Sequence, residues 1–140
     1  MTLLTAEGLY AGYGGVDILR NTHLHVGADE IVVIVGPNGA GKSTAMKTVF
    51  GLVPIRAGRV TYRGDDITNQ PPEKMVGRGI AYVPQEANVF PSLSVMENLE
   101  LGAYVLSGSN APRIEKVFEI FPRLKERRHQ QAGVMSGGER

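Results

Sequence analysis

The first thirty residues alternate between apolar and polar positions, which is the pattern of β-strands with one buried face. Thr22, Leu24 and Val26 fall on one face, and the two histidines between them fall on the other. The chain then enters a wholly apolar run at 31–35, which is typical of a strand buried on both faces of a parallel sheet. We therefore expect short antiparallel strands followed by a buried central strand.

The middle of the chain alternates between helix and strand signals. A helix is expected over 42–50, because Gly51 is a natural C-terminal cap for it. Strands are expected at 59–62 and at 79–83, with a turn at 64–66 and a polar connection between them.

From Ser94 onward the apolar positions recur with a helical period. Ser94 and Glu97 are spaced as a capping box, and a second amphipathic helix should end near Pro122. The strongly basic stretch 123–129 is read as a solvated helix face in preference to a phosphate or lipid contact. The expected apolar stripes consist of Met96, Leu99, Ala103 and Leu106, and of Ile114, Val117, Phe118 and Phe121.

The segment 36–44 carries the most specific chemistry, because it completes the pattern G-x-x-x-x-G-K-[ST] directly behind the apolar run. Its glycines leave backbone N–H groups free to converge on a polyphosphate, and the N-terminus of the following helix favours the same anion. Lys42 adds a charge at the β- and γ-phosphates, and Ser43 supplies a hydroxyl for Mg²⁺. A nucleotide triphosphate site explains this better than a chance glycine-rich turn. Its expected residues are Gly36, Pro37, Asn38, Gly39, Ala40, Gly41, Lys42, Ser43 and Thr44.

The last residues suggest a second anion site. Ser136 and Glu139 are spaced as another capping box, and Gly137 and Gly138 between them allow close approach to the backbone. A serine hydroxyl and glycine N–H groups at the start of a helix can bind an anion.

Composition excludes several classes of protein. Hydrophobic residues make up 42% of the chain and charged residues 21%, and the formal charge of +1 offers no basic excess for nucleic acid. The chain has no cysteine, so disulfides and thiolate metal sites are excluded, which suits a reducing compartment. No apolar run reaches the length of a membrane span, and the N-terminus lacks the pattern of a signal peptide. Any membrane association is therefore expected to be peripheral.

Two other groups of residues could carry chemistry. His23 and His25 could ligate a metal, but no third ligand candidate lies near them in the sequence. Asp65 and Asp66 could be a catalytic acidic pair, but they follow Gly64 and an alternating strand, so a turn explains them better. Neither group rivals the phosphate loop.

The order of the motifs resembles that in the ATP-binding subunits of ABC transporters. The phosphate loop is followed by the segment Tyr82-Val83-Pro84-Gln85, by a helix start at 90–99 and by Ser136-Gly137-Gly138-Glu139. The resemblance covers the whole chain. Two positions differ from the family pattern, since Met135 replaces the usual leucine and Glu139 the usual glutamine.

The resemblance implies roles for individual residues. Tyr13 corresponds to the aromatic residue that stacks on adenine, and Gln85 to the glutamine that reaches Mg²⁺ and the attacking water. Ser136, Gly137, Gly138 and Glu139 correspond to the signature that touches the γ-phosphate of ATP held by a partner subunit. Lys42 and Gln85 are then the residues of this chain that serve catalysis.

The implied fold is an α/β fold, a P-loop NTPase of the ABC ATPase type. An antiparallel β-subdomain and a parallel core sheet would occupy 1–84, and the Q-loop, the helical subdomain and the signature would occupy 85–140. The implied partners are transmembrane permease subunits, a second ATP-binding subunit in a head-to-tail dimer and, indirectly, a solute-binding protein. The implied location is the cytoplasmic face of a bacterial membrane, with no nucleic acid bound.

Within that family, 88–104 and 121–128 are most similar to ATP-binding subunits of branched-chain amino acid importers, whose relatives serve urea or short amides. Residues of such subunits do not contact the transported solute, so the chemistry of this chain does not identify that solute.

Hydrolysis by P-loop enzymes also needs an acidic residue at the end of an apolar strand to complete the Mg²⁺ shell. In the family this strand, a catalytic glutamate and a switch histidine all follow the signature. We therefore expect 1–140 to be the N-terminal part of an ATPase domain, with the C-terminal part absent, inactive in hydrolysis and poorly soluble by itself. The alternatives are a nucleotide-binding fragment without hydrolysis and a soluble, non-transport ABC ATPase.

Overall fold

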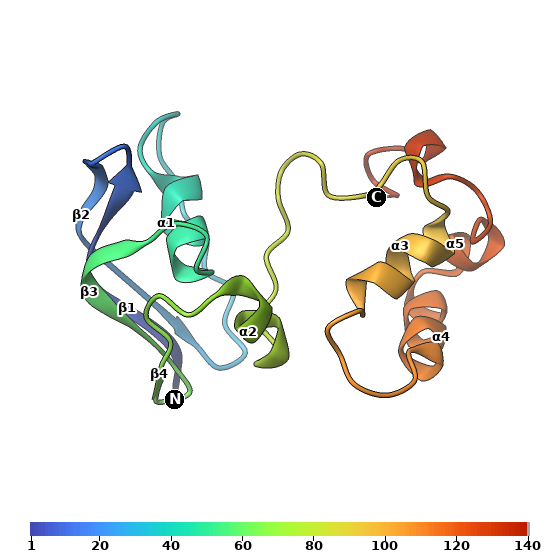
Figure 1. Cartoon of the computed structure of the whole chain (residues 1–140), viewed down its shortest axis with the longest axis horizontal. Helices are drawn as coiled ribbons and strands as arrows, with labels where there is room; N and C mark the ends of the chain where they lie inside the picture. The colour runs from blue at the N-terminus through green and yellow to red at the C-terminus, as the bar shows by residue number, and fades with distance from the viewer. Residues whose placement is uncertain (140) are drawn as a thin grey trace. The chain divides into compact units, whose positions relative to one another are not determined.

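The structure is a computed structural model that describes residues 1–139. The chain divides into two compact units, the first at Met1–Tyr82 and the second from Val83 onward. The first contains all four strands and two helices, and the second contains short helices (Figure 1).

The first unit is built on a four-stranded sheet in the order β2-β1-β3-β4. Its strands are β1 (Thr2–Tyr13), β2 (Val16–Gly27), β3 (Ile55–Tyr62) and β4 (Asp65–Asp66), and each neighbouring pair is antiparallel. The antiparallel strands expected from the alternation are confirmed, with His23 and His25 on the exposed face. At 12 residues each, however, β1 and β2 are longer than expected, and β3 starts at Ile55 instead of Arg59.

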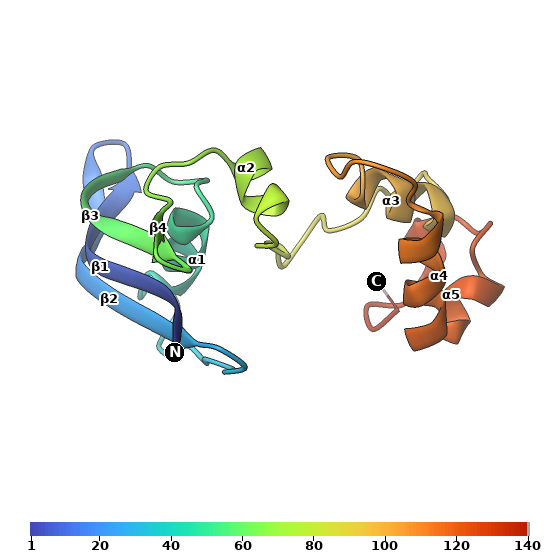
Figure 2. The ribbon, with the colours of Figure 1, turned by 90° about the horizontal axis from the view of Figure 1, so that it is seen from below.

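The two long strands bend around α1 (Lys42–Val49), which lies against one face of the sheet (Figures 1 and 2). Register shifts interrupt the pairing of β1 with both neighbours, and such bulges bend strands. At Gly58 of β3, which has a φ of 97°, a Cβ atom would lie 2.5 Å from the carbonyl oxygen of Glu7. β1 and β3 can cross this closely only because that position has no side chain.

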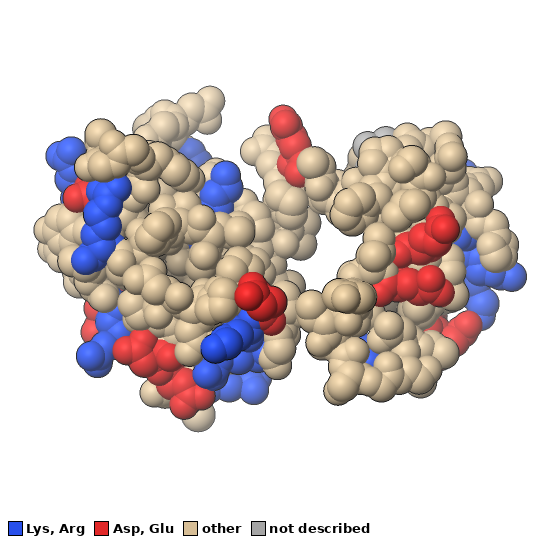
Figure 3. Space-filling view, viewed as in Figure 1, with Lys and Arg blue, Asp and Glu red and all other residues tan. Residues whose placement is uncertain are grey.

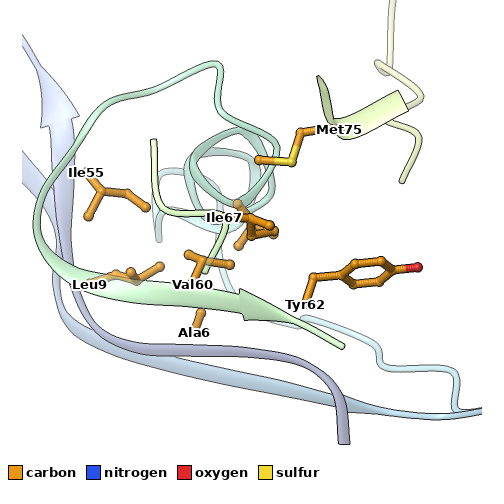
Figure 4. Packing of buried hydrophobic residues seen from close by; sticks show 8 residues of the cluster. Ala6, Leu9, Ile55, Val60, Tyr62, Ile67 and Met75 are labelled. Atoms are coloured by element: carbon orange, nitrogen blue, oxygen red, sulfur yellow. The ribbon is translucent and has the colours of Figure 1, made fainter. Parts of the chain in front are cut away.

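The core of the first unit lies between the sheet, α1 and α2 (Pro72–Gly77) (Figure 4). Met75 of α2 is fully buried, and Phe50 and Ile80 pack against the cluster from its edge. The ring of Phe50 lies 5.7 Å from that of Tyr82, centroid to centroid. The buried members are Ala6, Leu9, Val49, Ile55, Val60, Tyr62, Ile67 and Met75.

The acidic pair Asp65 and Asp66 has a structural place in β4, where it pairs with the end of β3. Asp66 accepts a hydrogen bond from the backbone N–H of Thr68 at 2.8 Å, and Asp65 forms an ion pair with Arg78 at 2.8 Å. Hydrogen bonds from Thr68 lower the pKa of Asp66, with a smaller contribution from the charge of Arg59. The turn after Gly64 therefore accounts for this pair.

Two segments expected to be strands, the central parallel strand 31–35 and the strand 79–83, are not strands. Ile31, Val33 and Val35 are 92%, 74% and 83% exposed. A central parallel strand needs a hydrogen-bonded neighbour on each side and helices on both faces, and no segment within 1–139 pairs with either run. The run is apolar, but an apolar composition alone does not supply the neighbouring strands that a central strand needs.

The second unit is built around α3 (Val95–Gly102), α4 (Ala111–Ile120), α5 (Pro122–Glu126) and the 3₁₀ turn η1 (Ala132–Val134). The capping box expected at the start of α3 is confirmed. The Ser94 hydroxyl accepts from the N–H of Glu97 at 3.2 Å, and the Glu97 carboxylate accepts from the N–H of Ser94 at 2.7 Å. Val95, Ala103, Ile114, Phe118, Ala132 and Met135 form the buried positions of this unit.

Backbone hydrogen bonds tie the chain after α5 to the start of α3. The N–H groups of Val95 and Met96 donate to the carbonyls of Gln130 and Arg128, both at 2.9 Å, and the N–H of Ala132 donates to the carbonyl of Leu93 at 2.8 Å. The basic stretch is therefore held by its backbone, while most of its side chains face solvent, as expected.

Lys and Arg side chains share the visible surface with Asp and Glu side chains (Figure 3). Among the residues described, no helix is long and apolar enough to cross a bilayer.

Candidate functional site

The glycine loop lies between β2 and α1, and two of its glycines are required by the backbone. Gly39 and Gly41 have φ angles of 82° and 93°, which residues with a Cβ atom adopt only with strain. At Gly41, the N-cap of α1, a Cβ atom would also lie 3.2 Å from Leu19 and 3.3 Å from Ile18. The loop can thus press against β2 and still turn directly into the helix.

The side chain of Lys42 folds back onto the backbone of its own loop. Its ammonium group donates to the carbonyl oxygens of Gly36 at 2.6 Å and Pro37 at 2.7 Å. The side chain is half-buried, and the turn is further closed by a bond from the N–H of Ala40 to the carbonyl of Pro37 at 3.2 Å. The cation is therefore held inside the ring of backbone that the glycines create.

The two hydroxyl side chains in the first turn of α1 differ in their exposure to solvent. Ser43 is exposed, whereas Thr44 is 7% exposed and faces the interior. No acidic side chain stands in this first turn, so the positive end of the helix dipole is not offset locally. The Ser43 hydroxyl and the helix N-terminus are thus free to act on an anion or its counter-ion.

Lys42 lines two hollows. One, of about 290 Å³, is lined by Ile18, Leu19 and other β2 residues together with Ala40 and Gly41. The other, of about 390 Å³, is lined by apolar residues of β2 and of 31–35 together with Ser43. β2 thus forms one wall of the site, a contribution that the sequence did not reveal.

Tyr13 does not line either hollow. It lies at the end of β1, where it pairs with Val16 across the hairpin turn, and it is 49% exposed. An exposed aromatic ring at a hairpin is a suitable stacking surface.

Gln85 belongs to the second unit, where it is exposed in the segment before α3. This segment is anchored by a residue that the sequence did not single out as functional, Asn98. The Asn98 amide accepts from the N–H of Phe90 at 2.7 Å and donates to the carbonyls of Phe90 at 3.1 Å and Ser94 at 2.9 Å. In the sequence, a polar asparagine among the apolar positions of α3 was the one indication that its side chain has a structural role.

The signature residues form a turn in which Ser136 and Glu139 contact each other. One carboxylate oxygen of Glu139 accepts from the Ser136 hydroxyl at 2.7 Å and from its N–H at 3.0 Å. The described residues do not continue as the expected helix, and Arg140 lies outside them. A Cβ at Gly137 or Gly138 would meet nothing within 4 Å, so the backbone there is open to a ligand.

Two arginines approach the same carboxylate. Arg127 lies 3.3 Å and Arg123 3.7 Å from the other oxygen of Glu139. The hydrogen bonds from Ser136 lower the pKa of Glu139 most, and the charges of Arg127 and Arg123 lower it further. Glu139 is therefore held as a carboxylate.

Within the part of the chain that the structure describes, no three His, Asp or Glu side chains gather closely enough to hold a metal. His23 instead accepts from the N–H of Gly8 at 3.4 Å and lies 3.2 Å from Asn21. It is part of the β1–β2 surface.

The ABC transporter family pattern matches residues 19–140, which include the phosphate loop, Gln85 and the signature. The chain belongs to the ABC transporter family. The sequence is 40% identical to a probable branched-chain amino acid transport ATP-binding protein, LivF, of Archaeoglobus fulgidus and 38% identical to BraG of Pseudomonas aeruginosa. It is also 38% identical to the lipopolysaccharide export system ATP-binding protein LptB of Escherichia coli. These alignments cover 98–100% of this chain and 59% of each relative, so the chain spans about three fifths of their length.

Solved structures show the same relationship to ABC transporters. A nucleotide-free ATP-binding cassette superposes with a TM-score of 0.85 at 28% identity, over 99% of this chain and 61% of that one. The ADP conformation of another cassette gives a TM-score of 0.79 at 29% identity with the same coverage. The ABC ATPase fold expected from the motifs is therefore confirmed, although 31–35 and 79–83 are not strands here.

Proposed function

We propose that this chain is the nucleotide-binding part of the motor subunit of an ABC transporter, which binds ATP with Mg²⁺ and, as the full-length protein, hydrolyses ATP to drive transport. The observation that carries this proposal is the position of the Lys42 ammonium group inside the glycine loop, 2.6 Å and 2.7 Å from two backbone carbonyls. A cation held there, at the N-terminus of α1, can exchange these neutral acceptors for phosphate oxygens, which bind it more strongly.

The loop residues fit a triphosphate and its magnesium ion. Gly39 leaves the loop backbone open, since a Cβ there would meet nothing within 4 Å. Ser43 offers one exposed hydroxyl oxygen, and Mg²⁺ in such sites takes few protein ligands beside phosphate oxygens and water. When bound, the ion would neutralise charge on the β- and γ-phosphates.

The proposal also gives roles to residues outside the phosphate loop. In our proposal the exposed ring of Tyr13 stacks on adenine, and Gln85 senses the metal and the attacking water. Ser136, Gly137 and Gly138 of one subunit contact the γ-phosphate bound to the other. The motor would sit peripherally on the cytoplasmic face of the membrane, against permease subunits.

For the cargo we propose branched-chain amino acids, or related amides or urea, taken up together with a solute-binding protein. The support is the identity of 38–40% to two branched-chain amino acid transport ATP-binding proteins. An exporter motor is the second candidate, because LptB is 38% identical over the whole chain. Uptake of labelled leucine by cells with and without the gene separates the two, since an export motor would leave uptake unchanged.

Nucleotide binding is tested by titrating the full-length protein with a fluorescent ATP analogue. Lys42→Ala should weaken binding by about 2 kcal/mol, or roughly thirtyfold, because a charge-assisted contact to the phosphates is lost. Lys47→Ala is the matched control, since this lysine lies in the last turn of the same helix. Unchanged affinity in the Lys42 variant would refute the proposal.

A further inference from the structure

Glu139 stands at the centre of a charge cluster in the second unit. Its carboxylate accepts two hydrogen bonds from Ser136 through one oxygen, and Arg127 and Arg123 approach the other oxygen. Arg127 also donates to the first oxygen, at 3.5 Å. Arg127 is the closer, at 3.3 Å against 3.7 Å, and its side chain is 33% exposed where that of Arg123 is 68% exposed. Because solvent screens an exposed charge more strongly, Arg127 contributes more to holding Glu139.

A carboxylate in this position opposes phosphate binding at the turn 136–139, because both groups are negatively charged. The Ser136 hydroxyl directs its proton at Glu139, and a negative charge 2.7 Å from that hydroxyl repels an incoming phosphate. A glutamine would place a neutral amide there, whereas this chain keeps a glutamate. Some other group must offset the charge and keep it from competing with the ligand.

We propose that Arg127 is a positioning residue that acts through Glu139. It draws the carboxylate toward the basic stretch and neutralises it, so that Ser136 and the two glycine N–H groups can face a phosphate. The inference rests on the proposed function for its phosphate, and on the contacts of Arg127 for its mechanism. Arg123 assists from a more exposed position.

A purely structural role for Arg127 predicts a different result from charge compensation. If Arg127 only supports the fold, its removal does the same damage whichever residue stands at 139. If it compensates a charge, its removal does no damage once that charge is gone. Glu139→Gln tests this directly, because the amide keeps an oxygen acceptor for Ser136 but carries no charge.

The first measurement is ATP hydrolysis by the full-length protein, assembled with its membrane subunits. Arg127→Ala should raise KM for ATP about fivefold with a smaller change in kcat, because the phosphate meets an uncompensated carboxylate. Arg128→Ala is the matched control, since this neighbouring arginine is exposed and donates to the carbonyl of Lys125 instead. The double variant Arg127→Ala/Glu139→Gln should have the KM of Glu139→Gln alone. An equal loss in both backgrounds overturns the proposal.

The second measurement needs no nucleotide. The amide signal of Ser136, followed by NMR as the pH is lowered, reports protonation of the Glu139 carboxylate to which it donates. The midpoint should move to higher pH in Arg127→Ala and stay in place in Arg128→Ala, because within residues 1–139 the charges that lower the pKa of Glu139 are those of Arg127 and Arg123. An unmoved midpoint in the Arg127 variant overturns the positioning role. Hydrolysis that does not depend on Lys42 refutes the proposed function separately, and with it the phosphate part of this inference.

Discussion

The side-chain amide of Asn98 pairs with the backbone of Phe90 in both directions, at 2.7 Å and 3.1 Å. This pair fastens the segment before α3 to the helix, and a third bond from the amide reaches the carbonyl of Ser94. The segment that carries Gln85 therefore ends at a fixed point, even though it contains no helix or strand of its own.

Asn98→Ala should destabilise the second unit by about 1–2 kcal/mol, because two backbone groups of Phe90 lose their partner. The free energy of unfolding, measured by urea denaturation of the full-length protein, checks this value. Asn88→Ala, at an exposed asparagine in the same segment, is the control and should change stability by less than about 0.5 kcal/mol. Equal effects of the two substitutions would show that the Asn98 contacts are not formed in solution.

Gly41→Ala should be more damaging than Gly39→Ala, although both glycines have positive φ. Either substitution strains the backbone by about 1–2 kcal/mol. Only at position 41 does the new methyl also meet Leu19 and Ile18, at 3.2 Å and 3.3 Å. Thermal unfolding midpoints of the two variants provide the comparison, and a larger loss at position 39 would contradict the close approach of the loop to β2.

Gln85→Ala should leave ATP affinity within about twofold and reduce hydrolysis in the assembled transporter, if Gln85 couples the nucleotide to the membrane subunits. Its exposure indicates that it does not support the fold of its own unit. Glu86→Ala, at the next exposed residue, serves as the control. Normal transport-linked turnover in the Gln85 variant would remove this role.

The capping box of α3 should make the second unit sensitive to acid. Hydrogen bonds from the backbone N–H and the hydroxyl of Ser94 lower the pKa of Glu97. A carboxyl whose folded-state pKa is depressed stabilises the fold fully above its unfolded pKa of about 4.3, and this contribution is lost as pH falls through the folded value. Glu97→Gln should therefore flatten the dependence of unfolding free energy on pH below about 4.3, which urea denaturation at a series of pH values would measure.

Features set by neighbours in sequence were predictable, and features set by distant partners were not. The glycine turn around Lys42 and the Ser94–Glu97 box depend on residues close together in the sequence, so their spacing was enough to predict these local conformations. The run 31–35 reads as a central strand, but a strand exists only with partners, and residues 1–139 provide none. The contact of Arg127 with Glu139 joins side chains twelve positions apart across a turn, and only the folded backbone brings them together.

The exposed run that ends at Val35 couples the order of the phosphate loop to any pairing of this run with another strand. Gly36 follows that run directly, so fixing Ile31–Val35 in a sheet also fixes one end of the loop, and a bound nucleotide fixes it from the other end. Each event orders part of the backbone, so the other event then loses less conformational entropy. By thermodynamic reciprocity, a strand that pairs with this run strengthens nucleotide binding by the same factor as the nucleotide strengthens the pairing. If the proposed site binds ATP and a partner strand pairs with this run, nucleotide affinity would also report how completely that pairing has formed.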